Sequence, residues 1–404
     1  MKKQWLQLAF FNLFLVASIG VILRYKIAFS LPFIDQKHLL HGHSHFAFSG
    51  WVTHLLMTLL IGVLSKSKGN QVYGEYKWYV YANLFSGFGM LLSFPIQGYG
   101  LISISFSTLS ILISYAFTIK YWKDLNRYRS GLVSSMAIKF SLLSIVIASL
   151  GTFALAFMMV TKNLHQNWYL ASVYFYLHFQ YNGWFFFAIL GLFVSKLELI
   201  EGLVSPLKKI VQLFGIACIP AYFLSALWLP IPIWAYWMVL VAAILQVIGL
   251  AILIKTILKA KEAIKRLFSN KSIWLFQLAG LAFTIKILLQ LGSTIPNLSQ
   301  LAFGFRPIVI GYLHLVLLGF ISIFLIAYTL SNYFLETNNQ INKAIGIFVF
   351  GIIVNEILLM AQGIAALKYW GIPMIDLGLL FAALILFIGV SYINLCLRKI
   401  EIKE

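Results

Sequence analysis

The stretch HLLHGHSHFAFSGWVTH, residues 38–54, decides how this chain can fold. It holds five of the eight histidines and opens an apolar run that continues to about residue 64. Imidazole is polar, titrates near neutrality and is a common metal ligand. Inside a bilayer such side chains are expensive, usually face the protein interior and mark a functional site. The stretch therefore predicts a membrane-embedded site for haem or a metal, with opposing ligands supplied by other parts of the chain.

The composition of the 404-residue chain is that of a polytopic α-helical membrane protein. Hydrophobic residues make up 61% of it and charged residues only 10%, and the mean hydropathy is +0.92. Long, nearly charge-free apolar runs are typical of transmembrane helices, and they do not alternate over short strands as in a transmembrane barrel. The predicted fold class is an all-α bundle of membrane-spanning helices.

The formal net charge of +19 would suggest a nucleic-acid partner in a soluble protein. Here the Lys and Arg residues fall mostly in short loops between apolar runs, where they set the orientation in the membrane. Alternate loops differ strongly in positive charge, which predicts a multi-pass protein of the bacterial cytoplasmic (inner) membrane with both termini in the cytoplasm. Membrane lipid is the expected surrounding, and no nucleic acid is expected to bind.

Apolar runs of about twenty residues or more predict about twelve membrane-spanning helices. The first begins like a signal peptide but lacks a convincing cleavage site, so a retained helix is expected. Every loop is short, which predicts a single transmembrane domain, 1–404, and no internal sequence repeat is evident. The predicted helices cover residues 4–28, 38–64, 77–95, 99–122, 132–161, 166–195, 206–228, 231–258, 272–293, 305–333, 341–366 and 373–397.

The second, sixth and tenth predicted helices all start at the outer face and run inward. At a rise of about 1.5 Å per residue, His45 and His314 each lie roughly 10–15 Å below the outer boundary. His178 lies at a comparable or slightly greater depth. Three histidines on three helices therefore share one layer of the membrane, which is the best indication of a common site.

Two faces of the second helix carry histidines. His38, His41 and His45 recur at i, i+3 and i+7 on one face, whereas His43 and His54, eleven apart, lie together on a nearly opposite face. A bis-histidine haem needs one imidazole from each side of the ring, usually from different helices. Ligand candidates here are His41, His43 and His45; the alternative is a polar vestibule that binds metal adventitiously.

Gly50 and Trp51 follow these histidines. A glycine at this place lets a flat macrocycle or a neighbouring helix approach the backbone closely. The indole of Trp51 can stack on the macrocycle or simply pack.

The tenth helix, GFRPIVIGYLHLVLLGFISIFLIAYTL (304–330), has His314 as its one histidine. Gly319 follows it at the spacing that separates His45 from Gly50, which favours an axial-ligand role over a hydrogen-bonded structural one. Arg306 lies about two turns outward and suits bidentate pairing with haem propionates, or else anchors the helix at the interface.

The sixth helix carries a polar cluster in aromatic surroundings. His178 and Tyr181 stand at i and i+3 on one face. They can ligate a second metal such as Cu or Fe, or line a catalytic site for a small gas or a quinone. The alternative is a hydrogen-bonded polar seam between helices.

Glu356, on the eleventh helix, is the clearest buried acid and a candidate for a proton path. Lys286, in the ninth, is expected to extend its ammonium group toward the interface. Cys218 and Cys396 lie in separate apolar runs outside any CxxC or CxxCH pattern, so no disulfide framework, zinc finger or covalent c-type haem is predicted.

The spacing His43-x-His45-xxxx-Gly50-Trp51, together with His314-xxxx-Gly319, is similar to that of the NnrS family of membrane haem proteins associated with nitric oxide stress. The helix count, the cytoplasmic termini and the histidines of helices two and ten resemble the haem-copper oxidase subunit I superfamily. The resemblance implies a b-type haem between a helix-two histidine and His314. It also implies an oxidoreductase that handles nitric oxide or passes electrons, with a quinone or an electron-donor protein as partner.

The chain departs from the oxidases in three places. The run 206–228 has no histidine, so the usual three-histidine copper site cannot be assembled. Val316 stands where oxidases have the second histidine of helix ten, and Tyr181 follows His178 by three residues where the commonest oxidase form has four. A proton-pumping terminal oxidase is therefore disfavoured. The alternative function is a membrane transporter that binds Cu or Zn, which would lack the haem chromophore.

Overall fold

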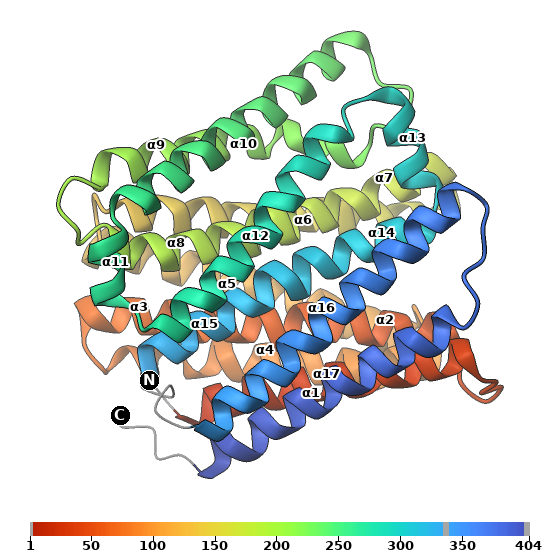
Figure 1. The fold of residues 1–404 in the computed structure, drawn as a ribbon, viewed down its shortest axis with the longest axis horizontal. Helices are drawn as coiled ribbons and strands as arrows, with labels where there is room; N and C mark the ends of the chain where they lie inside the picture. Colours follow the sequence, from red (N-terminus) through yellow and green to blue (C-terminus); the bar gives the residue numbers. More distant parts are fainter. Residues whose placement is uncertain (1–2, 334–338, 400–404) are drawn as a thin grey trace. The chain divides into compact units, whose positions relative to one another are not determined.

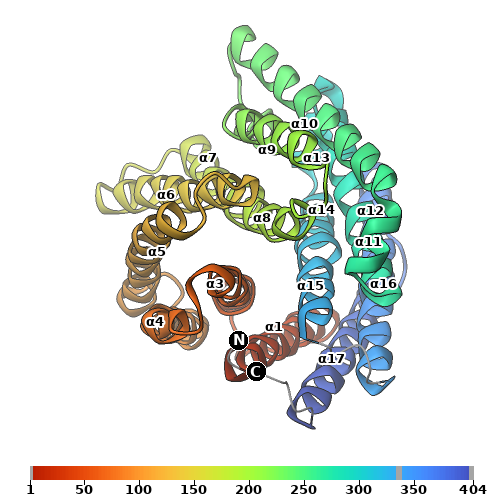
Figure 2. The same ribbon diagram turned by 90° about the vertical axis from the view of Figure 1, so that its left-hand side faces the viewer.

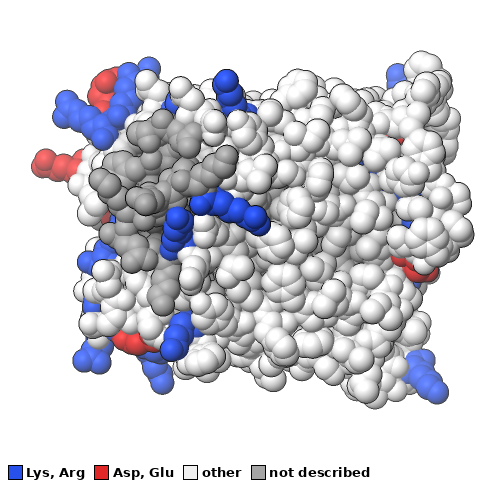
Figure 3. Space-filling model, turned by 90° about the horizontal axis from the view of Figure 1, so that it is seen from below, with Lys and Arg blue, Asp and Glu red and all other residues white. Residues whose placement is uncertain are grey.

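The computed structural model describes residues 3–333 and 339–399, and it confirms an all-α, multi-pass membrane protein (Figure 1). Eleven helices in these ranges are long and apolar enough to cross a membrane. On the face shown in Figure 3, charged side chains gather toward the helix ends and other residues cover the surface between them. This distribution suits helices whose middle parts contact lipid.

Eleven of the predicted runs match helices of the structure. Three of these helices are continuous rods in which an α-helix changes to a π-helix and back: α2–η1–α3 (Gln36–Phe46, Ala47–Thr53, His54–Lys68), α7–η2–α8 (Gln166–Leu177, His178–Phe185, Phe186–Leu197) and α14–η4–α15 (Arg306–His314, Leu315–Ser322, Ile323–Tyr333). The other eight are α1 (Lys3–Ala28), α4 (Val72–Gln97), α5 (Leu101–Tyr128), α6 (Val133–Val160), α10 (Ile233–Lys259), α12 (Asn270–Gly292), α16 (Asn339–Leu367) and α17 (Ile375–Lys399). Two short helices, α11 (Lys261–Leu267) and α13 (Pro296–Gly304), lie between spans.

The predicted run 206–228 is a broken helix. It forms α9 (Val204–Cys218), which is too short to be counted as a span, followed by the 3₁₀-helix η3 (Pro220–Ser225). Proline has no backbone N–H and its ring clashes with the preceding turn, so the α-helix ends just before Pro220. The break leaves backbone carbonyls at the end of α9 that need partners from elsewhere.

The described residues group into two compact units, one made of residues 3–117, 325–333 and 339–399 and the other of residues 118–324. The single domain expected from the sequence stays a prediction. In the first unit α16 and α17 run side by side, α1 packs against α17, and α2 packs against α4 (Figures 1 and 2). In the second unit α6 packs along α7–η2–α8, α9 along α10, and α12 against η4. These pairings position the histidine-bearing segments within each unit.

A buried ion pair fastens the α5–α6 loop to the end of α8 in the second unit. Arg129 Nη2 lies 3.3 Å from Glu198 Oε1, and only 8% and 4% of the two side chains are exposed. The backbone N–H of Ser134 donates to Glu198 Oε2 at 3.0 Å. Because the carboxylate is paired on both oxygens, this group is structural.

Candidate functional site

Three membrane spans change from α-helix to π-helix at or just after a histidine. The segment η1 begins two residues after His45, η2 begins at His178, and η4 begins directly after His314. A π-helical turn gives up the regular α-helical hydrogen-bond pattern, is rare, and is frequent at functional sites. The structure therefore singles out the three histidines that the sequence placed at a common depth.

The same three segments share a short sequence pattern. Residues 45–52 read HFAFSGWV, residues 178–185 read HFQYNGWF and residues 314–321 read HLVLLGFI. In each, a glycine follows the histidine by five positions and an aromatic residue follows the glycine. The copy that sequence reasoning missed is His178 with Gly183, and an alignment of the three histidine segments finds it.

Buried amide side chains of neighbouring helices hold the backbone of η1. Asn12 Nδ2 of α1 donates to the Gly50 carbonyl at 2.6 Å, and Asn83 Nδ2 of α4 donates to the Ser49 carbonyl at 3.0 Å. In a bilayer, carbonyls released by an irregular helix must find partners within the protein. Sequence reasoning missed both asparagines, although an amide within an apolar run is itself a signal.

In the second unit, Ser141 of α6 supports η2 by donating from Oγ to the Trp184 carbonyl at 3.0 Å. The segment η4 is held differently, because Ser322 Oγ donates to the carbonyl of Leu317 in its own helix at 2.8 Å. Each π-helical segment thus has a polar side chain that pairs one of its carbonyls.

The glycines of the repeat serve close packing. A Cβ on Gly183 would lie 2.4 Å from Ser144 Cβ of α6, whereas a Cβ on Gly319 would lie 3.3 Å from Ala282 Cβ of α12. An added Cβ is therefore accommodated more easily at Gly319 than at Gly183.

Gly50 faces the Phe46 ring of its own helix, which stands 2.5 Å from the place of a Cβ. Trp51 is 2% exposed, and its ring centroid lies 5.6 Å from that of Phe10 in α1. Gly50 and Trp51 thus both lie in close contact with aromatic side chains, and their predicted part in holding a macrocycle stays a prediction.

The predicted histidine face of α2 is confirmed, and it meets the end of α4. The His45 ring stacks on Phe94 with centroids 4.4 Å apart and planes at 9°. The His41 ring meets Tyr99 edge-on at 4.7 Å. His38 lies on the same face, one turn nearer to the start of the helix.

Asp35 begins this helix as its N-cap, with its carboxylate accepting from the His38 backbone N–H at 2.7 Å. That hydrogen bond, which favours the charged form, holds the pKa of Asp35 below its usual range. The cap fixes where the histidine face starts.

The opposite face of this helix, predicted to carry His43 and His54, lies toward α1. His43 Cε1 is 3.6 Å from the place of a Cβ on Gly20, and His54 Nε2 donates to the Trp5 carbonyl at 2.9 Å. His54 is fully buried. Its hydrogen bond to α1 makes it a structural histidine.

His178 is held by the protein at both ring nitrogens. Its Nε2–H donates to the Cys218 carbonyl at 2.8 Å, and Nδ1 accepts from Asn182 Nδ2 at 3.2 Å. The Cys218 carbonyl stands where Pro220 ends α9, so the imidazole pairs a group that the broken helix leaves open. Tyr181, predicted as its catalytic neighbour, is buried, with its ring 6.4 Å from the Tyr312 ring of α14.

His314 is held at Nδ1, which donates to the Ile310 carbonyl one turn earlier at 2.8 Å. This hydrogen bond assigns the proton to Nδ1 and the lone pair to Nε2. Ligating histidines almost always donate their other N–H to a carbonyl, a carboxylate or water in this way. Arg306 begins the same helix and is exposed.

Two further polar groups were named from the sequence. Glu356 is half-buried in α16 and accepts from Asn355 Nδ2 at 3.2 Å. Lys286 is 5% exposed, and its Nζ lies 5.5 Å from the centre of the Phe283 ring and 5.9 Å from that of Phe186. The expectation that Lys286 reaches an interface is wrong, because aromatic rings enclose its ammonium group within the second unit.

The predicted ligand histidines fall into separate places. Within residues 3–333 and 339–399, no three His, Cys, Asp or Glu side chains are grouped so that they could hold a metal ion. His41 and His45 share a face and His43 lies on the opposite one, while His178 and His314 belong to the other unit. A ready-made metal centre built from three His, Cys, Asp or Glu ligands is therefore not part of the described structure.

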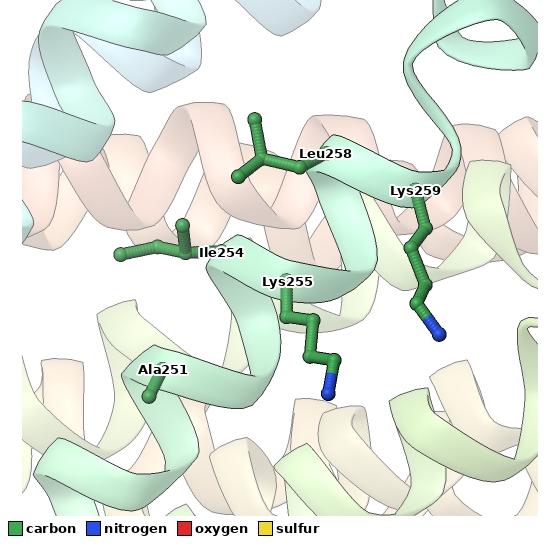
Figure 4. Close-up of a pocket in the computed structure, with 5 residues that line it drawn as sticks. All are labelled: Ala251, Ile254, Lys255, Leu258 and Lys259. Carbon is green, nitrogen blue, oxygen red and sulfur yellow. The ribbon is translucent and has the colours of Figure 1, made fainter.

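One surface hollow lies apart from all of these residues. It is formed by a single face of α10 near its end, and its lining residues are all exposed or half-buried: Ala251, Ile254, Lys255, Leu258 and Lys259 (Figure 4). An apolar stripe with lysines at a helix end is what a span presents to lipid and its headgroups. It carries no part of the candidate site.

Comparisons with known proteins give no relative from which a function could be carried over. No protein-family model matches the chain, and no curated protein sequence matches it. The geometry of the histidine segments is therefore the basis for inferring a function.

Proposed function

We propose that this protein binds a b-type haem in the membrane, with His314 as an axial ligand, and works as an oxidoreductase in nitric oxide handling or respiratory electron transfer. The hydrogen bond from His314 Nδ1 to the Ile310 carbonyl carries the proposal. It orients the ring and leaves the lone pair on Nε2, which is the donor that haem iron requires.

Two features of the histidine segments support this proposal. All three segments pair a histidine with a π-helical turn, which is a feature of functional sites. Arg306 is exposed at the start of α14, two turns from His314, where a guanidinium suits a haem propionate. The sequence predicts the second axial ligand on α2, as His43 or His45.

The residues of the chain have defined tasks in this function. Bound haem supplies an iron that exchanges one electron or binds a small gas such as nitric oxide. The Ile310 carbonyl fixes the orientation of the His314 imidazole. Arg306 would neutralise a propionate at the edge of the haem, and apolar side chains of η4 would exclude water. The proposed setting is a bacterial cytoplasmic membrane with both termini in the cytoplasm, and a quinone or donor protein as the electron source.

The test is a reduced-minus-oxidised optical spectrum of the purified protein, with and without nitric oxide. We expect a b-type spectrum, and we expect H314A to lose haem while the protein stays in the membrane. H165A is the matched control, because His165 is exposed in the loop before α7. H43A and H45A then identify the second ligand.

The outcomes separate the functions. A shift with nitric oxide supports gas binding, and a b-type spectrum that ignores nitric oxide supports electron transfer by a six-coordinate haem. Haem retained at wild-type level in H314A contradicts the ligand assignment. A colourless protein contradicts the haem proposal and favours the Cu or Zn transporter.

A further inference from the structure

The histidine face of α2 has features that haem ligation by His314 does not use. His41 and His45 stand one helical turn apart, which brings i and i+4 side chains onto one face. Their rings are bounded by Phe94, stacked on His45 at 4.4 Å, and by Tyr99, which meets the His41 ring at 4.7 Å. All four residues belong to one compact unit.

The imidazoles on this face lack strong protein partners in the described part of the chain. His41 Nε2 is buried without a hydrogen bond. His45 Nε2 has the Tyr99 hydroxyl at 3.4 Å, which is long for a hydrogen bond from a hydroxyl. A buried, unpaired ring nitrogen calls for an explanation, and bound water or an ion is a common one.

The loop after α4 holds Tyr99 over these rings. The backbone N–H of Gly98 donates to the Phe94 carbonyl at 2.8 Å, and Ser103 Oγ donates to the Gly100 carbonyl at 2.9 Å. Gly98 has φ +57°, and a Cβ there would meet the imidazole of His38. Glycine is therefore required both for the turn and for the adjacent His38 ring.

From this geometry we propose that His41, His45 and the Tyr99 hydroxyl bind a divalent first-row cation such as Zn²⁺, at a site separate from the proposed haem ligand His314; with His45 in this site, His43 is the candidate on α2 for the second axial ligand. Two histidines at i and i+4 on one helix face form a known zinc-binding pair, and imidazole suits Zn, Cu and Ni. Tyr99 is 41% exposed, so a cation reaches the rings from the surface.

Three protein donors make this an open site. Structural zinc sites use four protein ligands, whereas sites that act on a ligand keep a position for water or substrate. His38 lies one turn toward the helix start and carries a further imidazole on the same face. The site therefore suits a cation that exchanges with the medium or binds a further small ligand.

The experiment is a calorimetric titration of chelator-stripped full-length protein with Zn²⁺ alone. We expect one equivalent to bind, H41A and H45A each to weaken binding at least tenfold, and Y99F to weaken it less. H43A is the matched control, because His43 lies on the opposite face of the same helix, and H165A controls for an exposed histidine. Co²⁺ added in place of Zn²⁺ should give visible d–d absorption in the wild type that H41A loses.

The results also distinguish this site from the haem site. H41A should retain its haem, which shows that it folds, and H314A should lose haem but bind Zn²⁺ normally. Three results would overturn the cation site: no stoichiometric Zn²⁺ binding by the wild type, an equal loss in H43A and H41A, or normal Zn²⁺ binding by H45A. Haem loss in H314A together with any of these results leaves the haem proposal intact.

Discussion

The segments around His178 and His314 share one sequence pattern, but their imidazoles make different hydrogen bonds. Both histidines open a π-helical stretch in the second unit, and both are followed by a glycine at the fifth position. His178 gives its N–H to the Cys218 carbonyl of another helix and its lone pair to the Asn182 amide. His314 gives its N–H to Ile310 of its own helix, which directs the lone pair to Nε2.

The sequence pattern alone therefore does not decide the role of its histidine. The first copy stabilises a broken helix, because the Tyr222 N–H turns to the Ile219 carbonyl in η3 and leaves the Cys218 carbonyl to His178. The second copy orients its ring through a carbonyl of its own helix. The position of the proton on the imidazole, set by the nearest carbonyl, differs between the structural His178, at Nε2, and the proposed ligand His314, at Nδ1.

The largest expected effect comes from removing the structural histidine. We expect H178A to lower the free energy of unfolding by about 2–3 kcal/mol, since it leaves the Cys218 carbonyl and the Asn182 amide without partners in the interior. In haem-free protein, H314A should cost under about 1 kcal/mol, because the lost bond is within one helix and alanine favours helix. Thermal unfolding in detergent, followed by circular dichroism, measures both.

H165A serves as the control for the loss of an exposed histidine. If haem-free H314A were as destabilised as H178A, the proposed difference between the two histidines would be wrong. Equal losses would mean that both rings are structural.

The glycines give a smaller, matched contrast. We expect G183A to lower the free energy of unfolding by about 2 kcal/mol, because its Cβ would collide with Ser144 Cβ on a packed helix. G319A should change it by less than about 1 kcal/mol, since the 3.3 Å approach to Ala282 Cβ is relieved by small shifts and alanine favours the helical state. The same unfolding measurement applies, and equal effects would show that the two copies pack alike.

Hydropathy and periodicity predicted most of the fold, because a membrane span is decided by a local property of about twenty residues. The two histidine faces of α2 were also predictable, since side-chain direction follows from position along the helix. The broken helix α9 was not predicted. Pro220 lies in an apolar run, and a hydropathy scale does not register a missing N–H.

The support of η1 and η2 and the state of His178 depended on distant residues. The carbonyls of η1 pair with Asn12 and Asn83, which lie on two other helices. The tautomer of His178 depends on a carbonyl 40 residues away in sequence. Lys286 has a side chain long enough to reach either an interface or an aromatic cluster, so only packing decided its burial. Such pairings cannot be read from one segment alone.

The smallest expected effect concerns the N-cap of α2, the helix that leads into the third copy of the pattern. The Asp35 carboxylate caps α2 and has a lowered pKa because it accepts from the His38 backbone N–H. A lowered pKa means that the cap stabilises the helix above the ordinary value of about 3.9, and that this contribution is lost as the pH falls through the lowered pKa.

Hydrogen exchange of the amides at residues 38–41, corrected for intrinsic rates, should therefore lose protection below about pH 4, where an aspartate of ordinary pKa begins to protonate. Exchange around His178, deep within its span, should show no such change. D35N should keep protection at low pH because asparagine caps helices equally well, whereas D35A should have little at any pH. If D35A matched the wild type, the cap would not be what starts the histidine face, and the third copy would be ordered by packing on α4 alone.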